Sequence, residues 1–209
     1  ARLAEALKAA RLANWEYDVE NDIFTFNDQF YAIFQTTAEK AGGYQLSSAR
    51  YAELFVHPDD MPLVGIEIGK ALNSTERVYN ATLEHRIIYA DGKVGHISVR
   101  LTVERDENGK ITRYFGANQD ITERKQAEEA LRENEQRYQQ ILDAITDMVL
   151  VKAEKSRIIW ANKAFRDYYG MTNEQLRDMI DAPFAEPDYT LQYVKDDAYV
   201  FESGEILHI

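Results

Sequence analysis

The pattern of apolar and polar residues divides the chain into helical and extended stretches. Apolar residues at helical spacing predict a flanking helix over residues 1–12. From Trp15 the period changes to two, and two alternating runs are separated by the turn residues 20–22. This arrangement predicts a β-hairpin, and Asn27 is placed to cap the short helix that follows it.

The next stretch combines two more helices with three strands. Pro58 suits a first helical position, and the two carboxylates after it suit a first turn. The dipeptides Asp91-Gly92 and Asn108-Gly109 are typical of hairpin turns. An α+β domain is therefore expected over residues 13–122. Its predicted parts are helices at about 48–55 and 58–72 and strands at about 79–89, 94–104 and 110–118.

A densely charged segment, residues 123–145, has few helix breakers and predicts a connecting helix. Some of its apolar residues recur at the a and d spacing of a coiled coil, although Arg124 and Asn134 interrupt the seam. The helix is expected either to pair with a second copy or to pack on its neighbours. The predicted dimer seam consists of Leu131, Tyr138, Ile141 and Ile145.

Residues 146–209 repeat the beginning of the first domain. When Asn162 is aligned with Asn27, both copies read N-x-x-F-x-x-x-[FY]-x-x-T-x-E, and a two-strand pattern precedes each motif. Gly170 is expected to end the helix that Asn162 begins. A further helix is predicted at about 188–202 and the start of a strand at 206–209. We therefore expect the N-terminal part of a second domain, completed beyond Ile209.

Charge and composition exclude several classes of function. The 209 residues carry a formal net charge of −12, which disfavours binding to nucleic acid or anionic lipid. The absence of cysteine excludes disulfides, thiolate metal sites and thiol nucleophiles from these residues. There is no apolar run of the ~18 residues that span a membrane, and a cytoplasmic location is expected.

Several motifs then resemble the PAS domain family. Residues 120–125 read D-I-T-E-R-K, which is similar to the typical exit of a PAS domain. Residues 15–18 (W-E-Y-D), 57–60 (H-P-D-D) and 89–92 (Y-A-D-G) resemble a branch common in bacterial sensor kinases and cyclic-dinucleotide enzymes. The resemblance implies two copies of a five-stranded antiparallel sheet with helices on one face, joined by a helix.

The resemblance also implies a sensory role and suggests where it resides. Phe30, Phe34, Tyr51, Phe55 and His85 are candidates to line a ligand cavity, and core packing is the alternative for the aromatic residues. At the strand-to-helix junction, Asp120, Ile121 and Thr122 are candidates for signal relay. Asp120 is also placed to cap the helix there.

No cofactor is predicted from these residues. The cysteine of light-sensing flavin domains is absent, and residues 58–72 contain no histidine that could ligate haem. Non-covalent flavin or a small metabolite is left open without specific support. His85 and His96 lie on adjacent predicted strands, but no third ligand has suitable spacing, so no metal site is expected.

The sequence contains none of the common catalytic motifs, and we expect these residues to be non-catalytic. The main hypothesis is a sensory input and relay module that passes a signal through the connecting helix to an effector elsewhere. That effector is expected to be a histidine kinase or a diguanylate cyclase or phosphodiesterase. The alternative is a ligand-free module for protein interaction and homodimerisation through helices.

Overall fold

The computed structural model describes residues 12–180 and 187–208. The flanking helix predicted at residues 1–12 lies outside the described residues, except for Leu12, which begins the first strand. The chain divides into two compact units between Glu128 and Glu129. Each unit is described by itself.

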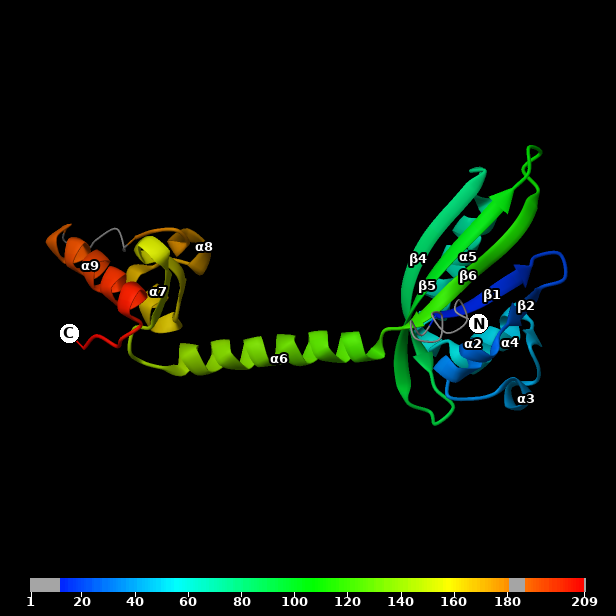
Figure 1. Cartoon of the computed structure of the whole chain (residues 1–209), viewed down its shortest axis with the longest axis horizontal. Helices are drawn as coiled ribbons and strands as arrows, with labels where there is room; N and C mark the ends of the chain where they lie inside the picture. Colours follow the sequence, from blue (N-terminus) through cyan, green and yellow to red (C-terminus); the bar gives the residue numbers. More distant parts are fainter. Residues whose placement is uncertain (1–11, 181–186, 209) are drawn as a thin grey trace. The chain divides into compact units, whose positions relative to one another are not determined.

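An antiparallel sheet of six strands forms the first unit, in the order β3-β2-β1-β6-β5-β4 (Figure 1). The predicted hairpin and the predicted meander are both confirmed. The sequence predicted five strands, and the additional one has only two residues, too few to show a period. The strands are β1 (Leu12–Asp18), β2 (Ile23–Phe26), β3 (Gln45–Leu46), β4 (Val78–Ile88), β5 (Val94–Arg105) and β6 (Ile111–Asp120).

Short helices connect β2 to β4. Asn27 caps the first of them by accepting a hydrogen bond from the Phe30 N–H at 2.9 Å, as predicted. The helix Ala38–Ala41 was not predicted, because a single turn leaves no helical period. The helices are α2 (Asp28–Ile33), α3 (Ala38–Ala41), α4 (Ser48–Phe55), the 3-10 turn η1 (Pro58–Asp60) and α5 (Met61–Asn73).

The H-P-D-D motif ties the start of α5 to the sheet. His57 caps η1 by accepting from the Asp59 N–H at 3.3 Å, and Pro58 occupies the first position. Asp59 and Asp60 lie in the first turn, as predicted, but the Asp60 carboxylate makes no capping hydrogen bond to α5. It accepts instead from the backbone N–H of Arg86 at 2.7 Å and from its guanidinium at 2.6 Å. A carboxylate held by two such donors joins β4 to η1.

The other end of α5 is capped by a buried cation. The Arg105 guanidinium, at the end of β5, donates to the Ala71 carbonyl at 2.6 Å and to the Leu72 carbonyl at 3.2 Å. A positive charge is favourable there because the last carbonyls of a helix carry partial negative charge. Arg105 is only 6% exposed. It occupies the next position after Val103 in the buried face of β5, and the sequence analysis did not assign it a structural role.

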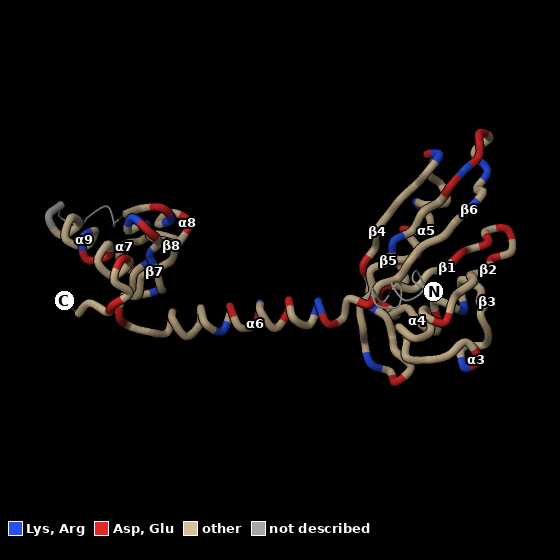
Figure 2. The backbone as a smooth tube through the Cα atoms, in the orientation of Figure 1, with Lys and Arg blue, Asp and Glu red and all other residues tan. Residues whose placement is uncertain are grey.

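The connecting helix α6 spans Thr122–Ala144, close to the predicted bounds. Charged residues of both signs follow one another along it (Figure 2). None of its residues is buried. A solvated helix of this composition gains support from local ion pairs, such as that between Arg124 and Glu128 at 2.9 Å.

The second unit contains a two-stranded sheet together with short helices and a longer one. Its core joins Ile158, Ala161, Phe165 and Leu176. Residues 206–208 of the strand predicted at 206–209 have no regular structure, and Ile209 lies outside the described residues. The elements are β7 (Leu150–Ala153), η2 (Glu154–Ser156), β8 (Arg157–Ala161), α7 (Lys163–Tyr169), α8 (Asn173–Leu176) and α9 (Pro187–Ser203).

Candidate functional site

A small cavity of about 40 Å³ lies inside the first unit, between α4, α5 and the sheet. A volume of this size is enough for about one water molecule. Apolar side chains form most of its wall, and Tyr51, Glu67, His85 and Asn118 supply polar groups. The lining residues are Trp15, Phe24, Phe26, Tyr51, Val64, Glu67, Ile68, Leu83, His85, Val99, Leu101, Tyr114 and Asn118.

Of the five predicted ligand residues, Tyr51 and His85 line this cavity. Phe30, Phe34 and Phe55 pack on one another instead, with ring centroids 4.3 to 5.6 Å apart. Phe30 and Phe34 are fully buried. The structure therefore places these three rings in the core beside the cavity, where they support its wall.

Asn118 is the central polar group of the cavity and was missed by the sequence reasoning. It is 1% exposed, and its Oδ1 accepts from the Trp15 indole N–H at 2.9 Å. It also hydrogen-bonds the Tyr51 hydroxyl, whose pKa is raised mainly by burial. Asn118 is in phase with Tyr114 in the two-residue period of β6, and this position is the sequence signal that could have identified it.

Glu67 brings a carboxylate to the cavity from α5. It accepts from the Tyr79 hydroxyl at 2.7 Å and pairs with Lys70 at 3.0 Å. The Tyr79 hydrogen bond, followed by Lys70, lowers the pKa of Glu67, so this group is ionised at neutral pH. The cavity thus contains an anion, an amide and a phenol.

His85 is buried against the cavity, and its Nδ1 donates to the Arg86 carbonyl at 2.9 Å. Burial lowers its pKa, so the ring is neutral at pH 7 and its Nε2 is the acceptor. His96 pairs with Arg86 and His85 with Ile97, which places the two histidines on opposite faces of the sheet. They cannot share a metal ion, and no cluster of potential ligands occurs among the described residues.

The predicted relay residues form one hydrogen-bonded junction between β6 and α6. Asp120 accepts from the Thr122 N–H and from the Tyr89 hydroxyl, both at 2.9 Å. Thr122 Oγ1 lies 2.8 Å from the same hydroxyl and accepts from the His96 N–H at 2.8 Å. Ile121 donates its N–H to the His96 carbonyl at 2.9 Å. The first turn of α6 is therefore fastened to the β4–β5 hairpin.

Glu84 on β4 makes a second set of contacts with α6. Its carboxylate accepts from Arg124 at 2.6 Å and lies 2.7 Å from the Lys125 ammonium. These two cations, Lys125 foremost, lower the pKa of Glu84. Three consecutive residues of β4 thus contact three different parts of the domain. Glu84 binds α6, His85 lines the cavity and Arg86 binds Asp60.

At the other end of α6, Asn162 joins the helix to the second unit. Its Nδ2 donates to the carbonyls of Asp147 at 2.8 Å and of Leu142 and Ile145 at 3.2 Å. Its Oδ1 accepts from the Val149 N–H at 3.0 Å and from the Phe165 N–H at 3.2 Å. The motif residue that caps α7 therefore also binds the carbonyls at the end of α6.

The four predicted seam residues are exposed, from 38% for Ile145, which directly follows α6, to 65% for Tyr138. Leu131 and Ile141 lie between these values. Their heptad spacing places them on one stripe of the helix. Nothing in the part of the chain that the structure describes covers this stripe.

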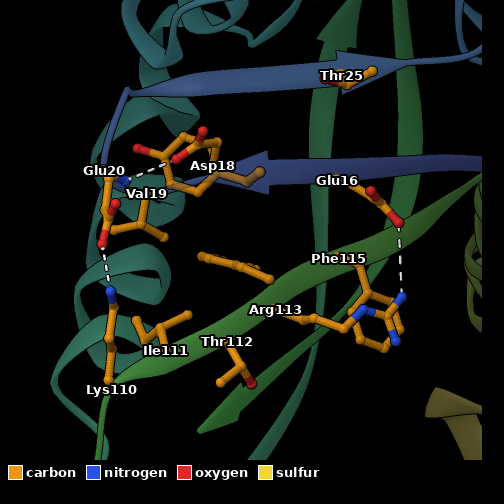
Figure 3. Close-up of a pocket in the computed structure, with 12 residues that line it drawn as sticks. Glu16, Asp18, Val19, Glu20, Thr25, Lys110, Ile111, Thr112, Arg113 and Phe115 are labelled. Atoms are coloured by element: carbon orange, nitrogen blue, oxygen red, sulfur yellow. Dashed lines mark hydrogen bonds and ion pairs between the residues drawn. The ribbon is translucent and has the colours of Figure 1, made fainter.

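A larger hollow of about 580 Å³ opens at the end of the sheet, between the end of β1 and the start of β6 (Figure 3). Ion pairs cross it from Lys110 to Glu20 at 2.9 Å and from Arg113 to Glu16 at 3.7 Å. It contains none of the predicted site residues. No sequence motif indicated it, because it forms where two strands diverge.

Two family models match the chain and decide its classification. One, described as "PAS fold", matches residues 23–118, and the other, described as "PAS domain", matches residues 136–199. The chain belongs to the PAS domain family. One match lies in each unit of the structure. The two matches agree with the two related domains that the repeat predicted.

Several known proteins are similar to this one. An uncharacterized protein of Sinorhizobium fredii, y4lL, is 32% identical over 57% of this chain and 14% of its own length. The probable diguanylate cyclase DgcE of Escherichia coli is 26% identical over 83% of this chain and 15% of its own length. A sensory box histidine kinase/response regulator structure from Burkholderia thailandensis has a TM-score of 0.54 at 20% identity, covering 67% of this chain and 99% of that one.

The chain spans between 7% and 15% of the length of the curated relatives it matches. The likeness to the solved structure shows the fold. Across the described ranges, 12–180 and 187–208, none of the helices has the length and apolar character needed to cross a membrane. What this PAS protein senses and what it controls are therefore matters of proposal.

Proposed function

We propose that the chain is the sensory input and relay module of a larger signalling protein. The state of the cavity in the first PAS domain is passed through α6 to the second domain and on to an effector elsewhere. One observation carries this proposal. The junction of Tyr89, Asp120 and Thr122 binds the first turn of α6 to the hairpin whose strands also form the cavity wall.

The sensed molecule is small and polar in this proposal. A cavity of about 40 Å³ is far below the ~300–1,000 Å³ of sites that take drug-sized ligands, so flavin or haem would require extensive expansion. Glu67 provides an anion, Asn118 an amide and His85 a neutral acceptor. These groups suit a small molecule that donates hydrogen bonds, and its entry would displace Val64 or Val99.

A cavity-filling variant tests the relay without knowledge of the ligand. Val99→Phe enlarges a side chain that faces the cavity, whereas Thr82→Phe enlarges an exposed one on the outer side of β4. We expect hydrogen exchange at residues 122–126 to change in V99F and to stay unchanged in T82F. When V99F is added to Tyr89→Phe, it should cause no further change in exchange beyond that of Tyr89→Phe alone. Equal exchange in V99F and the unmodified protein, with V99F still folded, would contradict the relay.

We further propose that α6 pairs with α6 of a second copy along Leu131, Tyr138, Ile141 and Ile145. Four exposed apolar side chains at heptad spacing support this. Sedimentation of the 209-residue chain should give a dimer, and Leu131→Glu combined with Ile141→Glu should give a monomer. Gln139→Glu, a charge change on the same helix outside the seam, should leave the dimer intact. A monomer at high concentration of the unmodified chain would refute the pairing.

The proposed role is non-catalytic and cytoplasmic. The relatives that carry enzyme names, DgcE and the peroxide stress-activated histidine kinase mak1 of Schizosaccharomyces pombe, match over at most 15% of their own length. A cyclase or kinase effector for this protein would therefore lie outside these residues. Sequencing the full gene and assaying the whole protein for kinase and cyclase activity would test this.

A further inference from the structure

The hollow between β1 and β6 exposes an unpaired strand edge. The two strands pair from Leu12 with Gln119 to Glu16 with Phe115, and the ladder ends there. Beyond it, the end of β1 pairs with β2 and the start of β6 pairs with β5. Among the residues that the structure describes, none pairs with residues 111–114 on the side toward β1. Main-chain groups at such an edge can pair with another extended chain.

The walls of this fork carry opposite charges. Glu16, Asp18 and Glu20 line the β1 side, and Lys110 and Arg113 line the β6 side (Figure 3). The Arg113 guanidinium lies 4.3 Å above the Phe115 ring, which orients it. An occupant with both a cationic and an anionic side chain would find a partner on each wall.

Apolar side chains lie between the two ion pairs. Val19 and Ile111 occupy this middle part and pack against the core, and the rings of Tyr17 and Tyr114 meet at 5.4 Å behind them. The fork thus combines a central apolar surface with charged ends. This arrangement of charged, apolar and charged surfaces complements a short extended peptide that has an apolar residue between two charged ones.

The ion pairs that cross the fork are easy to replace. The side chains of Lys110 and Glu20 are 69% and 74% exposed, and Arg113 lies 3.7 Å from both Glu16 and Glu104. Exposed pairs of this kind contribute little to stability. Exchanging them for the charges of an incoming peptide would therefore cost the domain little.

We propose that this fork binds a short extended peptide segment of a partner protein, which adds to the free edge of β6. The peptide carries an apolar residue that covers Val19 and Ile111, flanked by a basic residue that faces Glu16 at one end of the fork and an acidic residue that faces Lys110 at the other end. Recognition by strand addition draws affinity from main-chain hydrogen bonds and specificity from side chains. The site lies outside the cavity and does not depend on the proposed sensing role.

A titration of the isotope-labelled 209-residue chain, followed by amide NMR, tests the proposal. The probe is a terminally blocked peptide, Lys-Thr-Val-Thr-Glu, and the control peptide has proline in place of valine, which removes the central N–H. We expect saturable shifts confined to residues 16–20 and 110–115 with the first peptide and none with the second. Raising the salt concentration should weaken binding, because the charges are exposed.

Matched variants connect binding to the fork. The double variant Lys110→Gln, Arg113→Gln should raise the dissociation constant by roughly 5-fold, because exposed ion pairs with the peptide are lost. Lys93→Gln removes a similar exposed charge, paired with Asp91 at 2.8 Å in another turn, and should leave binding unchanged. No saturable shifts up to millimolar peptide, equal binding of the proline peptide, or an equal effect of K93Q would overturn the proposal. The charges would then serve only to keep other molecules away from a free edge.

Discussion

The Tyr89 hydroxyl donates to Asp120 at 2.9 Å and lies 2.8 Å from Thr122, although the tyrosine precedes both by more than 30 residues. The hydroxyl of Tyr89 is therefore a hydrogen-bond partner of both the carboxylate at the end of β6 and the hydroxyl at the start of α6. Asp120 in turn accepts the Thr122 N–H, so the strand end and the helix start share a single hydrogen-bonded group. A displacement of the β4–β5 hairpin can therefore act on α6 through this group, in addition to the ion pairs of Glu84 with Arg124 and Lys125.

Removing the Tyr89 hydroxyl should loosen the first turn of α6. We expect Tyr89→Phe to destabilise the domain by about 1–2 kcal/mol, because the Asp120 carboxylate and the Thr122 hydroxyl each lose a partner. Hydrogen exchange at residues 122–126 should rise, and urea unfolding measures the free energy. Tyr44→Phe is the matched control, since it removes an exposed Tyr–Asp bond to Asp28 far from α6. Similar exchange in Y89F and Y44F would argue against the junction.

Gly95 provides the room that the Tyr89 ring needs. A Cβ at position 95 would lie 2.4 Å from the ring, so Gly95→Ala must push Tyr89 away from Asp120 and Thr122. We expect destabilisation of about 1–3 kcal/mol and the same rise in exchange as in Y89F. Gly65→Ala in α5 meets no atom within 4 Å and should stabilise by about 0.5–1 kcal/mol. An unchanged first turn of α6 in a folded G95A protein would count against this account.

The pair of Asp60 and Arg86 should make stability depend on acid pH. Hydrogen bonds from Arg86 lower the pKa of Asp60 from its ordinary 3.8 to about 2. The folded state therefore favours the ionised carboxylate, and its contribution is fully present above pH ~4 and is lost as the pH falls toward ~2. This contribution is about 2 kcal/mol.

Asp60→Asn should accordingly be less stable than the unmodified protein at pH 7, and the difference should shrink between pH 4 and pH 2. Urea unfolding across this range measures it. Asp91→Asn removes the carboxylate of an exposed pair with Lys93 and should have little effect at any pH. A pH-independent difference for D60N would show that its ionisation does not stabilise the fold.

The two motif asparagines should differ in their effect on stability. Asn162 makes five side-chain hydrogen bonds and is fully buried, whereas Asn27 caps α2 through the Phe30 N–H. We expect Asn162→Ala to cost about 3 kcal/mol in the second unit and Asn27→Ala about 1 kcal/mol in the first. Hydrogen exchange at residues 142–166 should rise in N162A. Equal costs for both variants would mean that the contacts with the end of α6 contribute little.

The sequence by itself determined the order and type of most elements. Period-two runs, the Asp91-Gly92 and Asn108-Gly109 turns and the caps at Asn27 and Asn162 depend on local chemistry, and each appears where it was expected. The short elements β3, α3 and α8 were missed because two to four residues carry no period. The repeat of the N-x-x-F motif was enough to indicate two related domains.

Only the tertiary structure decided which of these residues meet. Phe30, Phe34 and Phe55 are equally apolar whether they line a cavity or fill a core, and their positions relative to the sheet distinguish the two. Asn118, Glu84 and Tyr89 gain their partners across 31 to 103 residues of sequence. The fork likewise exists because β1 and β6 diverge after Glu16 and Phe115. Such contacts follow from strand register and packing, which no local pattern encodes.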